Sequence, residues 1–204
     1  MRRTRPNGVV GLGLLLLMLC GGGVAGSAFS GQVWNVAEGK SSEGKAPRVI
    51  IKTKYGEMKV VLFQDLAPKH VESFLKLAKS GFYNGTIFHR IIPGFMIQGG
   101  DPYTKDPSKR NYYGMGGPGY TLPAEFNKIP HEAGILSAAR TADPNSAGSQ
   151  FFIMVDRAPH LDGQYTVFGE VETGLDVAQT IVKQPRDARD SPLERIELTI
   201  EVLD

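Results

Sequence analysis

Residues 88–101 read FHRIIPGFMIQGGD and place a single arginine among apolar and aromatic side chains. Two short apolar runs on either side of a Pro-Gly pair predict two strands joined by a turn. If the first run is a strand, Phe88, Arg90 and Ile92 share one face, and Arg90 lies against an apolar surface. The structural alternative is an arginine that snorkels toward a carboxylate partner. The functional alternative is a cation held at a binding site.

A second segment, GSQFFI at residues 148–153, repeats this combination of a polar and an aromatic side chain. Gln150 stands two positions before Phe152, so the two side chains are expected on the same strand face. Two such strands favour a site in which polar groups border an apolar pocket.

The remainder of the chain from Arg48 onward consists of short apolar runs broken by Gly and Pro. Helical spacing of apolar residues predicts one helix between Pro68 and Gly81 and a second from Leu175 to Val182. Many short strands with only two helices predict a mainly β fold, a closed or nearly closed antiparallel barrel. The expected strands are 49–51, 58–63, 88–92, 95–97, 135–138, 151–155, 167–171 and 196–202.

The composition is that of a globular protein and excludes a disordered chain, a collagen-like repeat and a disulfide scaffold. The 204 residues include 23 basic and 21 acidic side chains. Three of the basic ones lie in the first 28 residues, so residues 29–204 carry a net charge of −1. A nearly neutral body lacks the electrostatic footprint of a nucleic-acid-binding protein. The single cysteine, Cys20, also lies in the leader, which leaves the body without a disulfide, a thiolate or a cysteine metal site.

The leader has the organisation of an export signal. Arginines at positions 2, 3 and 5 precede an uncharged apolar run, and small residues follow up to Ala28. We predict a signal peptide over 1–28 and cleavage after Ala28. The alternative is an uncleaved membrane anchor, because residues 8–26 carry no charge. The polar segment 29–47 is predicted to be a flexible spacer, and 48–204 the functional domain.

Several motifs of other enzyme classes are absent or out of context. Gly114, Gly116 and Gly119 match a nucleotide-binding glycine pattern by letter, but Pro118 interrupts it and no helix follows. The four histidines have no metal-ligand spacing, so no metal site is predicted. No G-x-S-x-G elbow marks a hydrolase serine.

The two segments, together with GMGGPGY, GILS and LDGQYTVFG, resemble the cyclophilins, a family of peptidyl-prolyl cis–trans isomerases. The similarity runs from about Val49 to Val202, and the glycine-rich loop with Tyr165 is more similar to bacterial members. The resemblance implies a closed antiparallel barrel of about eight strands capped by two α-helices. It also implies an enzyme without a cofactor.

The same resemblance assigns site residues. Arg90 corresponds to the catalytic arginine, and Gln98 to a glutamine that contacts the peptide near it. The proline pocket corresponds to Phe95, Met96, Phe152 and Leu161. Ala139 and Arg140 fall on the strand that pairs with bound peptide, while Gly114 and Gln150 border the neighbouring pocket. Tyr165 stands where many members have histidine, and His160 where many have tryptophan.

The departures from the family pattern carry two expectations. Because the tryptophan replaced by His160 helps hold cyclosporin-type macrocycles, weak cyclosporin binding is expected. Residues 102–113 form a longer loop that alters substrate reach.

We therefore expect a prolyl isomerase that assists the folding of exported proteins in the periplasm or outside the cell. Its partners are proline-containing peptides and unfolded protein clients, with no nucleic acid, and with a membrane only if the leader is uncleaved. A monomer is expected. The alternative function is a non-catalytic chaperone or scaffold module that binds proline-containing segments.

Overall fold

The computed structural model describes residues 46–203. The predicted signal peptide or anchor lies outside these residues, as does the predicted spacer except for Ala46 and Pro47. Within the described part, no helix combines the length and the apolar character needed to cross a bilayer.

The described residues contain nine strands and two α-helices. The strands are β1 (Arg48–Thr53), β2 (Gly56–Leu62), β3 (Thr86–Ile87), β4 (Arg90–Ile92), β5 (Met96–Gly99), β6 (Ile135–Ala138), β7 (Phe151–Met154), β8 (Val167–Thr173) and β9 (Glu197–Leu203). The helices are α1 (Pro68–Lys79) and α2 (Leu175–Ile181). Short 3-10 turns occupy Pro102–Lys105, Pro107–Tyr112 and Pro159–Leu161. Both predicted helices are therefore present, and the predicted strands 49–51 and 58–63 pair with each other as β1 and β2.

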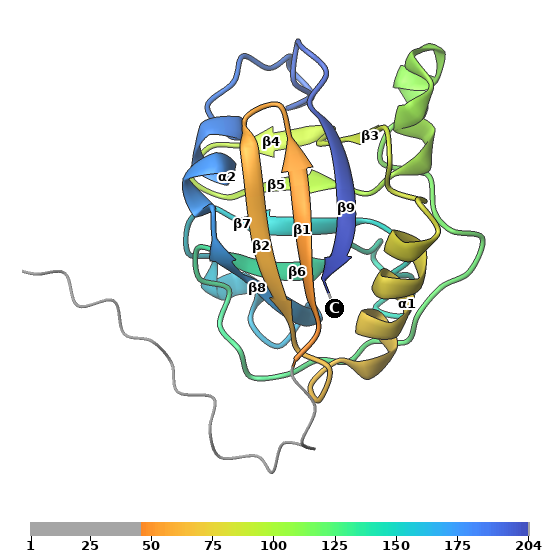
Figure 1. Ribbon diagram of the computed structural model, residues 1–204, viewed down its shortest axis with the longest axis vertical. Helices are drawn as coiled ribbons and strands as arrows, with labels where there is room; N and C mark the ends of the chain where they lie inside the picture. The colour runs from red at the N-terminus through yellow and green to blue at the C-terminus, as the bar shows by residue number, and fades with distance from the viewer. Residues whose placement is uncertain (1–45, 204) are drawn as a thin grey trace, which may run out of the picture. The chain divides into compact units, whose positions relative to one another are not determined.

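The strands form one curled antiparallel sheet in the order β3-β9-β1-β2-β8-β6-β7-β5-β4. Strands β9, β1 and β2 run side by side and cross in front of β4, β5, β6 and β7 (Figure 1). The mainly β, antiparallel character predicted from the sequence is confirmed, with nine strands in place of about eight.

The closed barrel predicted from the sequence is not confirmed by this strand order, which ends at β3 and β4. The predicted strand 88–92 is shortened to β4, and the unpredicted β3 precedes it, because the chain changes partner between the two. Phe88 N–H donates to Ile196 O beside β9, whereas His89 N–H donates to Gln98 O of β5.

The change of partner also resets the alternation of side chains. Phe88 is fully buried in the main core, while Arg90 is exposed and Ile92 packs with a second apolar cluster. The prediction that Phe88 and Arg90 share a face was therefore wrong. A uniform two-residue period holds only within one strand, and Phe88 lies between β3 and β4, outside both.

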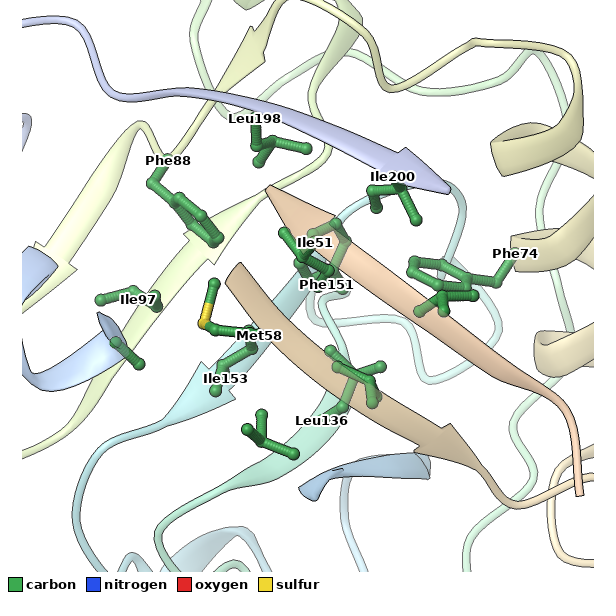
Figure 2. Packing of buried hydrophobic residues seen from close by; sticks show 14 of the residues in the cluster. Ile51, Met58, Phe74, Phe88, Ile97, Leu136, Phe151, Ile153, Leu198 and Ile200 are labelled. Carbon is green, nitrogen blue, oxygen red and sulfur yellow. The ribbon is translucent and has the colours of Figure 1, made fainter. Parts of the chain in front are cut away.

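The main core lies inside the curl of the sheet. Ile51, Met58, Ile97 and Ile153 come from strands far apart in the sequence and meet there (Figure 2). Both helices contribute to the same cluster: α1 buries Phe74 among the rings of its neighbours, and α2 buries Val177, Ala178 and Ile181. In Figure 1 the two helices flank the sheet on opposite sides. Burial of these apolar faces is the main stabilising contribution to the fold.

The first turn of α1 is capped from a distant loop. Pro68 occupies the start of the helix, and Ala67 before it offers no capping side chain. The Glu125 carboxylate accepts hydrogen bonds from the N–H groups of Lys69 and His70, at 3.1 and 3.0 Å, and lies 2.6 Å from His70 Nδ1. Although burial acts to raise the pKa of Glu125, these hydrogen bonds outweigh it and lower the pKa. The Glu125 carboxylate thus links its loop to the N-terminus of α1, where an anion is favourable.

Replacing this carboxylate tests the cap. We predict that Glu125→Gln lowers the free energy of unfolding at pH 7 by about 1–2 kcal/mol, the usual value of a helix cap. The contribution exists above the ordinary Glu pKa of 4.5 and is lost as the pH falls through the lower folded-state pKa. Urea unfolding at pH 7 and at pH 3 measures the difference. Glu132→Gln, which removes only an exposed ion pair, is the matched control; an equal loss in both variants would refute the cap.

Candidate active site

The register of three neighbouring strands places the predicted polar and apolar site residues in one row. Arg90 of β4 stands opposite Gln98 of β5, and Gln98 stands opposite Phe152 of β7. Met96 lies two residues before Gln98, so its side chain is on the same side of β5. Residues more than fifty positions apart are thus brought within one strand spacing of each other.

These side chains surround a small pocket of about 110 Å³. Met96, Phe152 and Leu161 are almost fully buried and supply apolar lining, while Arg90 is exposed at the pocket. Nine of the twelve site residues predicted from the sequence line it: Arg90, Phe95, Met96, Gln98, Ala139, Arg140, Phe152, Leu161 and Tyr165. A volume well below the roughly 300 Å³ of a small-molecule site fits a single ring better than a larger ligand.

The other three predicted residues lie beside this pocket. Gln150 donates through Nε2 to the carbonyls of Gly114 and Gly116, at 2.9 and 2.8 Å, and accepts from Gln98 Nε2 at 3.0 Å. Gly114 lines an adjoining cavity. His160 is exposed, and its ring lies 5.9 Å from that of Phe95.

The glycine-rich loop is held by protein groups. The buried Asp101 carboxylate accepts from the N–H of Tyr103 at 2.8 Å and from that of Gly114. Gly114 has a φ of +90°, and a Cβ on Gly116 would lie 2.1 Å from Asp101 Oδ1. The backbone approaches Asp101 so closely that glycine is needed at these positions. This packing accounts for the Gly114–Gly119 sequence pattern without a bound nucleotide.

Arg90 is not neutralised by a neighbour. Within residues 46–203 it takes part in none of the ion pairs, so the predicted structural alternative of a carboxylate partner does not hold there. The Gln98 side chain, opposite Arg90 on β5, is an uncharged amide that bonds to the Gln150 amide. The guanidinium is therefore not paired with an anion at the pocket.

Arg140 has a different environment from Arg90. Its guanidinium donates to the carbonyls of Gln164 and Thr141 and lies over the Tyr165 ring, 4.3 Å from the ring centroid. These contacts hold Tyr165 as one wall of the pocket.

Sequence reasoning missed a buried support behind Phe152. The His131 ring stacks on Phe152 with centroids 6.1 Å apart, and its Nδ1 lies 3.0 Å from Asp162 Oδ1. Its Nε2 lies 3.1 Å from Ser137 Oγ. Burial lowers the pKa of His131, against the opposing effect of Asp162.

Serine, histidine and aspartate in this order are the residue types of a hydrolase triad. Here Ser137 is fully buried and its hydroxyl donates to Thr166 O at 2.9 Å, so no substrate reaches it. The group fixes the ring of Phe152 instead. No spacing rule links these residues, and only the folded sheet brings them together.

His89 is a second buried histidine, next to Arg90 in the chain. Burial lowers its pKa from 6.5 to about 4, although the Asp101 carboxylate acts in the opposite direction; Arg90 lowers it further. His89 is therefore uncharged at neutral pH, and the charge beside the pocket comes from arginine.

The depressed pKa of His89 predicts an acid-sensitive fold. As the pH falls below 6.5, the unfolded chain takes up a proton that the folded chain refuses until about pH 4. Stability therefore decreases through this window, by roughly 3 kcal/mol for this group. In His89→Gln, the stability should change less between pH 7 and pH 4.5 than in the wild type.

Chemical denaturation at several pH values measures this difference. His160→Gln, at an exposed position, is the matched control and should keep the wild-type pH dependence. If His89→Gln and the wild type lose stability in parallel, the buried neutral histidine is refuted.

Comparisons with known proteins agree with the fold. Residues 48–202 match the family model described as cyclophilin type peptidyl-prolyl cis-trans isomerase/CLD. A probable peptidyl-prolyl cis-trans isomerase from Brucella suis is 44% identical over 164 residues, covering 78% of this chain and 84% of the relative. The chain therefore belongs to the cyclophilin family of peptidyl-prolyl cis–trans isomerases.

Solved structures agree with this assignment. A Cryptosporidium parvum cyclophilin type peptidyl-prolyl cis-trans isomerase is 36% identical, with a TM-score of 0.71 over 78% of this chain and 99% of that one. The same isomerase crystallised in the presence of the dipeptide Ala-Pro gives a TM-score of 0.69 at 36% identity, over 77% and 99% of the two chains. The enzyme class is that of the isomerases.

Proposed function

We propose that residues 48–204 rotate X–Pro peptide bonds with Arg90 as the catalytic residue and the apolar pocket as the seat of the proline ring. The observation that carries this proposal is that Arg90, which enters no ion pair within residues 46–203, lines a pocket of about 110 Å³ together with apolar side chains. The Ala-Pro dipeptide used with the Cryptosporidium relative contains the same imide bond.

The reaction needs a cation and no covalent step. An X–Pro bond isomerises over a barrier of about 18–20 kcal/mol, within tens to hundreds of seconds, because the prolyl nitrogen shares its lone pair with the carbonyl. In the twisted state the lone pair is localised on that nitrogen. A guanidinium that donates to it binds the twisted state better than the planar one, which lowers the barrier. Arginine suits this role because it stays charged and presents fixed donors.

Magnitudes indicate that Arg90 acts together with the pocket. A turnover of about 10–1000 per second requires the barrier to fall by roughly 4–7 kcal/mol. One hydrogen bond to a charged group supplies about 1.5–3 kcal/mol. The planar amide is more dipolar than the twisted one, so its desolvation against Phe95, Met96 and Phe152 destabilises the ground state. We assign the remainder of the barrier reduction to this pocket.

We also infer that the curled sheet works as a closed eight-stranded barrel. The segment that contains β3 and β4 donates to β9 with its first half and to β5 with its second half. Counted as one strand, it joins the two ends of the sheet and so supports closure. Such a segment fixes the chain to β9 shortly before Arg90, while Arg90 itself pairs with Gln98 of β5.

Arg90→Ala tests the catalytic role. We predict that kcat/KM falls ten- to a thousandfold, about 1.4–4 kcal/mol of transition-state stabilisation, while the melting curve is unchanged. A protease-coupled assay on a short Ala-Pro peptide measures the rate. The control Arg157→Ala removes an exposed arginine outside the pocket and should keep full activity.

Three other outcomes have distinct meanings. Unchanged activity of Arg90→Ala contradicts the catalytic role. Loss of folding would restore the structural interpretation of Arg90. Absence of acceleration by the wild type would leave the non-catalytic proline-binding module.

We propose further that this is a bacterial-type isomerase that acts outside the cytoplasm on exported proteins. The support is the leader sequence, with three arginines, an apolar run and small residues before Ala28. N-terminal sequencing of the protein from its native envelope or medium tests this, with Phe29 expected as the first residue. Recovery of Met1 contradicts cleavage and favours the membrane anchor. A monomeric state, weak cyclosporin binding and the choice of unfolded clients stay predictions.

A further inference from the structure

A second and larger cavity adjoins the proline pocket. It encloses about 310 Å³ and shares Arg90, Gln98 and Arg140 with that pocket. Its other walls come from two loops far apart in the sequence, which contribute Arg110 and Arg189. Since the two spaces have three residues in common, a ligand in one lies next to a ligand in the other.

The cavity is strongly basic in a body whose net charge is close to zero. Four arginines line it: Arg90, Arg110, Arg140 and Arg189. Its remaining lining residues include no acidic side chain, and His89 is uncharged at neutral pH because burial lowers its pKa to about 4. A local excess of positive charge on a nearly neutral domain attracts an anion to this position.

Nearby carboxylates neutralise only part of this charge. Asp187 lies 3.0 Å from Arg110 Nη2 with one oxygen, and its other oxygen accepts from the N–H groups of Arg189 and Ser191. Asp190 pairs with Arg186, and the buried Asp101 is occupied by N–H groups of its own loop. In residues 46–203, the side chains of Arg90, Arg140 and Arg189 enter no ion pair. Of the four guanidinium groups, only that of Arg110 therefore has a carboxylate partner.

We propose that this cavity binds an acidic side chain of the substrate, an Asp or Glu within three residues of the isomerised proline. The inference rests on the proposed isomerase function and adds a substrate preference to it. Because the cavities share a wall and an extended chain advances about 3.3–3.6 Å per residue, a carboxylate this close in sequence reaches the arginines while proline fills its pocket. Guanidinium groups match carboxylates with paired hydrogen bonds.

A carboxylate from the same peptide fits better than a separate polyanion. The net charge of −1 on residues 29–204 disfavours a long anionic ligand, while a single carboxylate needs only the local field. The arginines on the two loops then select substrates with an acidic side chain, without contacting the bond that isomerises.

Paired peptides test the preference. The two peptides of a pair are identical except that one has Glu and the other Gln at one of the three positions before or after an Ala-Pro or Pro-Ala centre. The full mature chain is assayed. We expect kcat/KM to be about three- to thirtyfold higher for the Glu peptide of at least one pair in low salt, and the ratio to fall toward one in 0.5 M salt.

Arg110→Gln and Arg189→Gln should lower that Glu-to-Gln ratio, and the double variant should bring it near one. Arg157→Gln removes the same charge on a surface outside the cavity and should keep the wild-type ratio. Melting curves of all variants check that they are folded.

The outcomes separate this inference from the isomerase function. Acceleration of both members of every pair to the same extent overturns the acidic preference and leaves the isomerase intact. An equal loss of preference in Arg157→Gln also overturns it, because net charge would then account for the effect. No acceleration of any peptide refutes the isomerase itself.

Discussion

The arrangement depends first on the antiparallel register that aligns Arg90, Gln98 and Phe152 across three strands. A shift of one residue in either pair would turn the guanidinium or the ring to the opposite face of the sheet. The core enforces the register, because the next row across the same strands, Ile91, Ile97 and Ile153, is fully buried. The site is thus a consequence of the same alternation that builds the hydrophobic core.

Two kinds of support preserve the pocket once the register is set. On the polar side, the Gln98 amide donates to Gln150, which donates in turn to the glycine-rich loop, so these uncharged amides do not neutralise Arg90. A glutamate at position 150 could not donate to the carbonyls of Gly114 and Gly116, and it would add a negative charge to this side of the pocket. On the apolar side, the buried His131 stacks behind Phe152 and is itself held by Asp162. The neutral amides leave the guanidinium unpaired, and the aromatic stack fixes the apolar wall beside it.

Much of this could be predicted from the sequence, because the relevant signals are local. The spacing of Val71, Phe74 and Ala78 predicted α1, and alternation along residues 196–202 predicted β9. Nine of the predicted site residues line one pocket. They could be predicted because the similarity to a known family extends over long motifs; composition alone would not have linked them.

The errors and omissions have a common cause, since they concern contacts between segments that have no fixed spacing in sequence. The partner change at Phe88 and His89 arises from the path of β9 and β5, which no local pattern records. The cap that Glu125 provides for α1, the His131 support and the loops carrying Arg110 and Arg189 likewise depend on tertiary placement.

The central claim is that Arg90 binds the twisted imide more tightly than the planar one. Exchange spectroscopy by NMR on an Ala-Pro peptide saturated with enzyme measures the interconversion rate on the protein and the affinity separately. For Arg90→Ala the account predicts an on-enzyme rate at least tenfold slower, with affinity for the planar peptide changed by less than about threefold. A variant that loses affinity but interconverts bound peptide at the wild-type rate would contradict it, because Arg90 would then serve only to hold the ground state.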